Sequence, residues 1–242
     1  NYNVVVGDEA GTAITTGDEN TFLGYAAGDA NTTGTNNVAT GTDAFGRNTT
    51  GSGNTAVGRT SLSFNTTASN NTAVGLSALL ANTTGTGNTA VGASALDAST
   101  TASYNVAIGL SALSADTLGA HAVAIGAGAL SRQNFTSATN NYNIGIGYDA
   151  GLNVTTGIEN TLIGGLAGDA ITDADYNVAV GKGALGTNQL GSRNTAVGTN
   201  SLNIANPASA VNTYNTALGY DAGYAVTTGI YNTLIGGLAG DA

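Results

Sequence analysis

The stretch Asn88-Thr89-Ala90-Val91-Gly92 recurs, with small changes, along the whole chain. Asn54-Thr55-Ala56-Val57-Gly58 precedes it, and Asn105-Val106-Ala107-Ile108-Gly109 follows it. Aligned on the last glycine there are fourteen copies, and eleven of the thirteen intervals between them have a 17-residue length. The other two, from Gly126 to Gly147 and from Gly198 to Gly219, have a 21-residue length. A fixed short period along an entire chain predicts a repeat architecture.

Each repeat can be numbered from its asparagine, which is position 1. Position 1 is Asn in thirteen copies, with Ala122 as the exception, and position 5 is Gly in all fourteen. Position 2 is Thr, Val or Ile, and position 4 is Val, Ile or Leu except at Thr40. Side chains two residues apart share a face of an extended chain, and β-branched residues favour strands. The glycine indicates a bend where a Cβ atom would clash or φ is positive.

The repeat length predicts an all-β fold. A 17-residue repeat with two glycine-marked corners suits a coil of two short strands, whereas helical repeats are longer and contain far less glycine. Stacked coils form a β-solenoid, a parallel β-roll, of about 14 coils. Equivalent residues then stack, and the position 1 amides form a ladder. We expect this ladder and the glycine corner at Asn54, Asn71, Asn88, Asn105, Gly58, Gly75, Gly92 and Gly109.

A second period lies on top of the first. The segment that begins at Gly147 recurs almost unchanged four repeats later, from Gly219. We therefore interpret residues 1–242 as one solenoid array with a four-coil super-repeat, in blocks 3–70, 71–142, 143–214 and 215–242. Neither end carries a capping sequence, and solenoids need caps. The expectation is that this array is a window of a longer repeat protein.

Two coils carry four extra residues each. Insertions in a solenoid bulge from a corner and leave the stack intact, so we expect surface loops that are candidates for binding. The residues concerned are Arg132, Gln133, Asn134, Phe135, Asn206 and Pro207.

Composition excludes several partners. The chain has 15 acidic and 5 basic residues, whereas nucleic-acid binding requires Lys and Arg to neutralise phosphates. An anionic membrane surface is disfavoured for the same reason. No apolar run approaches the roughly 18 residues that a membrane-spanning helix requires, so no membrane span is predicted. The absence of cysteine does not discriminate between compartments.

Position 3 bears on assembly. It holds Ala in nine copies, Gly145 in one, and larger apolar residues in four, and it is never polar. If positions 2 and 4 face inward, position 3 forms an apolar stripe on the outside, which requires cover by another chain. We expect a homo-oligomer interface that includes Val5, Phe22, Ala56, Ala73, Ala90, Leu162 and Leu234. The alternative orientation, with the Thr/Val columns outside, also leaves an apolar strip.

Candidate chemistry is sparse. The single histidine, His121, is expected at an exposed corner, and the carboxylates at positions 7 and 10 skip coils, so we predict no catalytic residue, no metal site and no cofactor. Six tyrosines precede the position 1 residue and form a partial column. Threonine and tyrosine columns could bind polysaccharide or ice, although Thr at position 2 is interrupted by Val or Ile in six coils.

The motif resembles known repeats. Asn71-Thr72-Ala73-Val74-Gly75-Leu76-Ser77-Ala78-Leu79 with Asn82-Thr83-Thr84-Gly85 is similar to the repeat shafts of phage and bacterial tail-fibre-like proteins. It also resembles, in style, the head β-rolls of trimeric autotransporter adhesins. The resemblance covers the full chain and implies a left-handed roll and a homotrimer. The repeat is longer than that usual in adhesin heads, and no stalk, anchor or chaperone segment is present in this sequence.

Together these observations favour a non-enzymatic structural role. The preferred hypothesis is the rod of an extracellular, cell-surface or virion fibre, which extends a tip that binds a host glycan or receptor and lies outside this sequence. The alternative is a binding module whose Thr or Tyr columns adhere to polysaccharide or ice. An enzyme built on a solenoid, such as a polysaccharide lyase, would need clustered charged residues in one groove.

Overall fold

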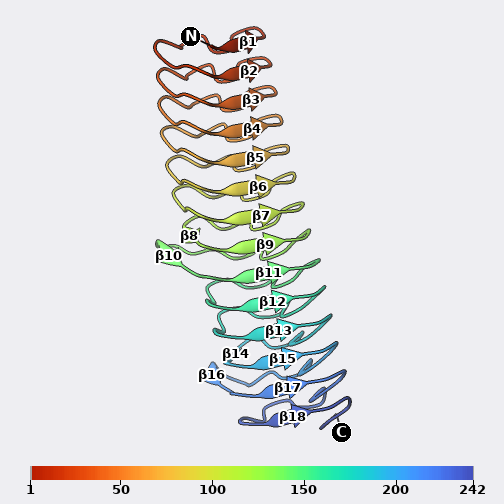
Figure 1. Ribbon diagram of the computed structural model, residues 1–242. Coiled ribbons are helices and arrows are strands. Elements are labelled where there is room, and N and C mark those ends of the chain that lie inside the picture. The colour runs from red at the N-terminus through yellow and green to blue at the C-terminus, as the bar shows by residue number, and fades with distance from the viewer. Residues whose placement is uncertain (1, 242) are drawn as a thin grey trace. The chain divides into compact units, whose positions relative to one another are not determined.

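The computed structural model describes residues 2–241. The chain forms two compact units, Asn1–His121 with Thr136–Thr139, and Ala122–Phe135 with Asn140–Ala242. No helix occurs among residues 2–241, and hence none that could cross a membrane. The predicted β-solenoid of about 14 turns is confirmed (Figure 1).

Each turn contributes one strand of three residues. In the first unit these strands are β1 (Val4–Val6), β2 (Thr21–Leu23), β3 (Val38–Thr40), β4 (Thr55–Val57), β5 (Thr72–Val74), β6 (Thr89–Val91) and β7 (Val106–Ile108). In the second unit they are β9 (Val123–Ile125), β11 (Ile144–Ile146), β12 (Thr161–Ile163), β13 (Val178–Val180), β15 (Thr195–Val197), β17 (Thr216–Leu218) and β18 (Thr233–Ile235). Within each unit successive strands pair in parallel in chain order.

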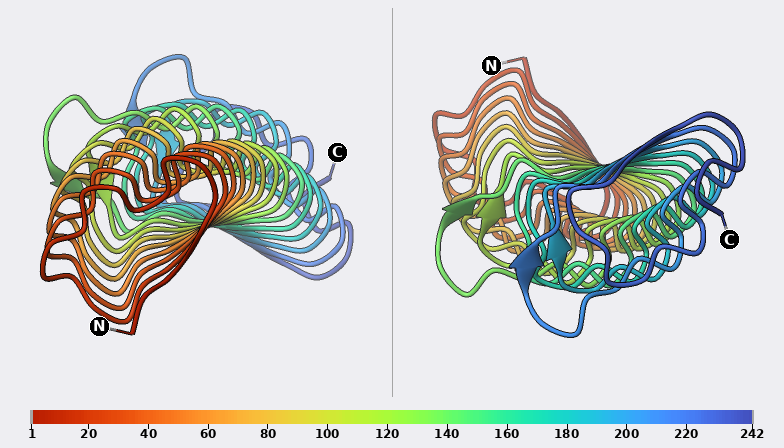
Figure 2. Two further views of the ribbon diagram at one scale, coloured as in Figure 1. Left: turned by 90° about the horizontal axis from the view of Figure 1, so that it is seen from above. Right: turned by 90° about the horizontal axis from the view of Figure 1, so that it is seen from below.

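The strand register reproduces the sequence period. Val74 pairs with Val91, its equivalent in the next coil, and each position of one strand faces the same position of the next. Across an insertion the register still joins equivalent residues, as for Val123 and Ile144. The four extra residues are therefore accommodated outside the main sheet. Figure 2 shows a green and a blue loop leaving the outline of the coils.

The expectation of two strands per coil is wrong. The additional strands have only two residues each and occur in a few coils; they are β8 (Gly119–Ala120), β10 (Thr139–Asn140), β14 (Gly191–Ser192) and β16 (Val211–Asn212). The rest of a coil turns sharply because several positions have positive φ. In the coil that starts at Asn71, Ser77 has φ 55° and Leu79 has φ 52°. Left-handed residues interrupt extended chain, so this side is joined by isolated backbone bonds such as Leu79 N–H to Ala95 O.

The core is a single thin layer, and most coils fill it in one of two ways. In half of the coils a leucine at position 9, such as Leu79, packs beside a small residue at position 3, such as Ala73, and both are fully buried. In the coil of Leu162 the large residue is at position 3 and position 9 is Gly168. A Cβ atom on Gly168 would lie 2.7 Å from Leu162 Cδ2. In the coils of Asn143 and Asn215 both positions are small, and a Cβ atom on Gly151 or Gly223 would lie 2.7 Å from a leucine of a neighbouring coil.

Candidate functional site

The outer face of the main sheet consists of positions 2 and 4. In β6, Thr89 and Val91 are half-buried, whereas Ala90 between them is fully buried. The same alternation occurs in most strands, and in strands with two neighbours the exposed fraction of the aliphatic side chains rises to 47% at Leu23 and 48% at Leu218. Position 4 thus places a column of aliphatic side chains, and position 2 a column of Thr, Val and Ile, on the outside. No charged residue occurs in either column.

The expected outward orientation of position 3 requires correction. Phe22, Ala56, Ala73, Ala90 and Leu162 have no exposed area, so they form the core and are not available to another chain. Val5 is 39% exposed and Leu234 half-buried, and both lie in strands with one neighbour, β1 and β18. Positions 2 and 3 are both free of charge, so charge did not distinguish inside from outside, although position 2 is Thr in eight coils and position 3 is never polar. The size of the side chain decides which position faces inward, since the space inside a coil admits Ala next to Leu.

The structure places the position 1 asparagines in a buried ladder. The backbone N–H of Asn88 donates to Oδ1 of Asn71 at 2.9 Å, and that of Asn105 donates to Oδ1 of Asn88 at 3.0 Å. Most Nδ2 groups donate across the coil to a backbone carbonyl further along the chain, as from Asn54 to Ala68 at 2.9 Å, whereas the buried Nδ2 of Asn177 has no partner. Most of these side-chain amides therefore join two coils and also close their own coil.

The position 5 glycines mark the corner after each strand. Gly58, Gly75, Gly92 and Gly109 have φ between 131° and 137°. A Cβ atom on Gly92 would lie 2.4 Å from the carbonyl oxygen of Gly109 in the next coil. Both reasons for glycine that the sequence suggested, positive φ and a close backbone approach, therefore apply at this corner.

A second asparagine ladder, which the sequence interpretation missed, occupies position 12. Nδ2 of Asn48 donates to Oδ1 of Asn31 at 2.7 Å, and the pattern continues through Asn65 and Asn82 at 2.9 Å each. The ladder stops where Ser99 takes the position. The sequence signal was the regular spacing of these four asparagines at the repeat length, which lies outside the Asn-Thr-Ala-Val-Gly motif.

Where Ala122 interrupts the main ladder, other residues supply the missing hydrogen bonds. The backbone N–H of Asn143 donates to Oδ1 of Asn141 at 2.9 Å, in place of a position 1 asparagine. Nδ2 of Asn143 donates to Oε1 of Gln133 at 2.9 Å and to the carbonyl of Gly157 at 2.7 Å. An insertion residue and a position 12 glutamine therefore supply what the missing asparagine would have supplied.

The insertions are only partly surface loops, which corrects the sequence interpretation. Gln133, Phe135 and Pro207 are buried, Asn206 is half-buried, and only Arg132 and Asn134 are exposed. The apolar and amide side chains at the start of each insertion fill the coil, so they are structural.

The exposed parts of the insertions lie further along, at 136–138 and 208–212. Near the first of them, Arg132 is the exposed charged residue, and its Nη1 donates to Oδ1 of Asn153 at 2.7 Å. Recognition of a partner by the first insertion would therefore depend on these exposed residues and not on the buried start of the loop.

The tyrosine column stacks on itself. The rings of Tyr214 and Tyr231 are 5.4 Å apart and nearly parallel, and the Arg193 guanidinium lies 4.3 Å from the Tyr176 ring centre. The two faces by which Tyr214 and Tyr231 contact each other are not available to a sugar ring. His121 joins this column in the first unit: it is half-buried, not exposed as expected, with its ring 5.3 Å from that of Tyr104.

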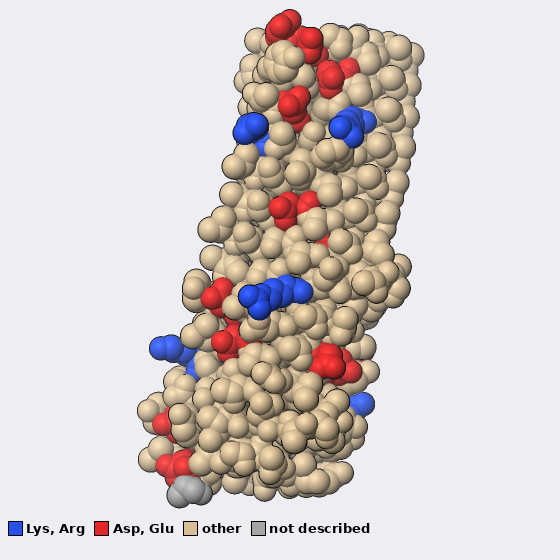
Figure 3. All heavy atoms as spheres, turned by 180° about the vertical axis from the view of Figure 1, so that it is seen from behind, with Lys and Arg blue, Asp and Glu red and all other residues tan. Residues whose placement is uncertain are grey.

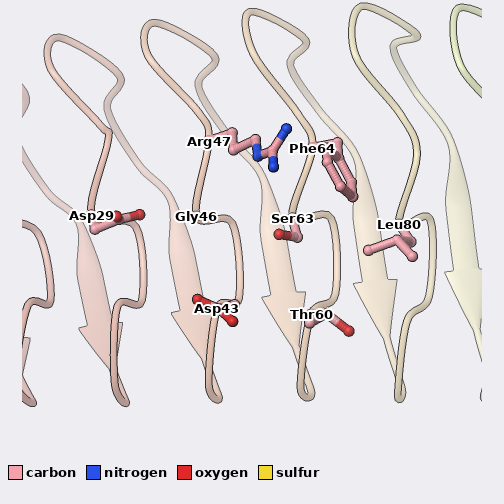
Figure 4. Close-up of a pocket in the computed structure, with 8 residues that line it drawn as sticks. All are labelled: Asp29, Asp43, Gly46, Arg47, Thr60, Ser63, Phe64 and Leu80. Carbon is pink, nitrogen blue, oxygen red and sulfur yellow. The ribbon is translucent and has the colours of Figure 1, made fainter.

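A groove of about 420 Å³ lies on another side of the coils in the first unit (Figure 4). Four residues at position 10 of successive coils form a row along it, and residues at positions 7 and 11 form its two sides. Figure 4 shows the row with Arg47 and Phe64 on one side and Asp43 and Thr60 on the other. The position 10 row consists of Asp29, Gly46, Ser63 and Leu80. The Arg47 guanidinium carbon lies 4.0 Å from the centre of the Phe64 ring.

One end of the groove, at Asp29, is acidic. Burial raises the pKa of the Asp29 carboxyl, and the nearby carboxylates of Asp43 and Glu9 raise that pKa further, while two backbone hydrogen bonds oppose them. Charged residues are sparse elsewhere. Figure 3 shows acidic and basic side chains separated by uncharged surface on the face behind that of Figure 1. Among residues 2–241, no three His, Asp or Glu side chains are grouped so that they could hold a metal ion.

No family model, no curated protein and no solved structure matches this chain.

Proposed function

We propose that this chain is the structural rod of an extracellular or virion fibre, bundled with further copies of itself, that extends a host- or surface-binding tip. The fold supports a mechanical role because each coil repeats the same bonds: a parallel strand, an asparagine rung and a slice of core. The proposal gives the chain no catalytic role.

The observation that carries the proposal is the uncharged outer face of the sheet. Its aliphatic column leaves Leu23, Ile108 and Leu218 more than a third exposed in water. A long apolar column that is exposed to water marks an interaction surface. The rest of the chain carries a net charge of −10, so two copies repel each other except where they meet through uncharged surface. This face is therefore the best surface for self-association, and the resemblance to fibre shafts favours a trimer.

Light scattering after size exclusion tests the proposal. We expect a mass near three times 23.5 kDa for the unmodified chain. Thr89→Lys places a charge on the outer face and should release monomers. Thr84→Lys makes the same change at an exposed position 14, away from that face, and should leave the assembly intact. A monomeric unmodified chain would contradict the assembly, and a trimeric Thr89→Lys variant would place the interface elsewhere.

A binding module is the second candidate, and one observation favours it. Thr55, Thr72 and Thr89 are register partners in adjacent strands, and all three face outward. Such a hydroxyl column could adhere to polysaccharide or ice. Thr72→Val removes one hydroxyl with little change of shape. Loss of polysaccharide retention, or of inhibition of ice growth, by that variant would support this function, and inactivity of the unmodified chain in both assays would exclude it.

A further inference from the structure

The groove in Figure 4 exists because Gly46 lacks a side chain. Gly46 has no positive φ, so the backbone does not require glycine there, in contrast to the position 5 corner. A Cβ atom on Gly46 would lie 3.3 Å from Oδ1 of Asp29, a tight contact that a small shift of that side chain relieves, and 3.6 Å or more from other atoms. Leu80 occupies the same position two coils later. The glycine therefore opens a space on the surface that the fold would allow a larger residue to fill.

Arg47 and Phe64, the pair beside this space, are also not required for the coils to stack. Arg47 and Phe64 occupy position 11 in successive coils, where the coils before and after them have Ala30 and Ala81. These alanine coils keep the same register, since β2 pairs with β3 and β4 with β5 as elsewhere. The cation–ring contact between Arg47 and Phe64 is thus an addition to a surface that folds without it.

We propose that this groove binds a neutral saccharide. Carboxylates only accept hydrogen bonds and a guanidinium only donates them, so a ligand that meets Asp29, Asp43 and Arg47 must do both. Hydroxyl groups do both, and the Thr60 and Ser63 hydroxyls add further partners on the groove wall. The apolar face of a sugar ring then has Phe64 and Leu80 to pack against. The volume lies in the range of about 300–1,000 Å³ that is usual for small-ligand sites.

The charges of the groove favour a neutral saccharide over an anionic sugar or a cation. An anionic sugar would be repelled by the two carboxylates at one end of the groove. A cation would be attracted by Asp29 and Asp43 but repelled by Arg47, and it would leave the apolar residues unused. Of these three classes, a neutral polyhydroxylated ring is the one that uses every residue of the groove. The proposal is independent of assembly, because the groove residues lie on a different part of the coil from the outer face of the sheet.

Isothermal titration and saturation-transfer NMR on the full chain test the proposal. The probes are maltohexaose, cellohexaose, laminarihexaose and mannohexaose, with oligogalacturonate as the anionic comparison. Gly46→Leu fills the groove with a residue that position 10 already accepts, and Arg47→Ala removes its donor. Arg59→Ala is the matched control, since it removes an exposed arginine outside the groove. Circular dichroism and thermal unfolding establish that each variant is folded.

We expect at least one neutral hexasaccharide to bind, with its Kd raised tenfold or more by Gly46→Leu and by Arg47→Ala and unchanged by Arg59→Ala. The proposal is overturned if no neutral probe binds the unmodified chain, if Gly46→Leu binds as tightly, or if only oligogalacturonate binds. These outcomes are read from ligand binding, so they remain separate from the mass measurement that tests the fibre.

Discussion

Phe22 fills the space that a side chain on Gly28 would need: a Cβ atom there would lie 2.6 Å from Cε2 of the ring. Two coils later the arrangement is reversed, with Ala56 at position 3 and Leu62 at position 9, both fully buried. Leu62 has φ 50° and Gly28 has φ 58°, so the backbone is alike in the two coils. The two positions therefore share one volume.

This shared volume predicts a strong coupling between the two positions. Phe22→Ala should cost about 3–5 kcal/mol through the cavity it leaves, and Gly28→Leu should be destabilising through the clash. The double variant restores the Ala/Leu arrangement of other coils and should recover most of the loss. Denaturant unfolding of the four proteins gives the coupling free energy. Additive effects would contradict the shared volume.

The corner glycines allow steric clash to be separated from φ strain. Gly92→Ala meets the carbonyl oxygen of Gly109 at 2.4 Å, whereas a Cβ atom on Gly236 has nothing within 4 Å. Both residues have positive φ, 137° and 126°. Gly236→Ala should therefore cost only the conformational strain, about 1–3 kcal/mol. Gly92→Ala should cost clearly more and lower the midpoint of thermal unfolding further. Equal effects would show that the close approach is unimportant.

Removing one rung of the ladder should be costly. Asn88 accepts from the backbone N–H of Asn105 and donates to the carbonyl of Ala102, and all of these groups are buried. Asn88→Ala leaves two buried backbone groups unpaired, at about 1–3 kcal/mol each. Asn212→Ala, at an exposed position, should change the free energy of unfolding by less than about 0.5 kcal/mol. A small effect at Asn88 would mean that water replaces the amide.

The carboxyl of Asp169 should make stability fall as pH rises. Burial raises its pKa above the ordinary value of 3.8, and the Asp149 carboxylate adds to the shift against one backbone hydrogen bond. A raised pKa means that the folded state holds the proton longer than the unfolded state. The stabilising contribution is therefore present below pH 3.8 and is lost as the pH passes the raised pKa.

Asp169→Asn removes this dependence. At neutral pH the variant should unfold at a higher denaturant concentration than the unmodified chain, and the difference should shrink towards acid pH. Denaturant unfolding at a series of pH values measures how this stability difference changes with pH. Asp173→Asn, outside the position 10 column, is the control, and a stability difference for Asp169→Asn that grows in acid would contradict the sign.

The sequence by itself determined what is periodic. The regular spacing predicted the parallel register, the Asn71–Asn88–Asn105 ladder and the glycine corner, because identical residues at a fixed interval can bond only to their own copies. The two longer intervals predicted where coils are enlarged. These features depend on spacing alone, and spacing is fully visible in a sequence.

Only the tertiary structure decided the features that depend on the volume inside a coil and on the direction in which a side chain points. Positions 2, 3 and 4 are all uncharged, so charge could not tell that Ala73 faces inward while Thr72 and Val74 face outward; the space beside Leu79 settles it. The sequence also placed Gln133 and Phe135 in a surface loop, yet they fill the coil that Ala122 leaves incomplete.

The groove at Gly46 is likewise a product of the tertiary structure. Its residues come from successive coils and are separated in the sequence by whole repeats. The stacking of the coils, which returns the chain to the same surface once in every turn, is the physical reason that they meet.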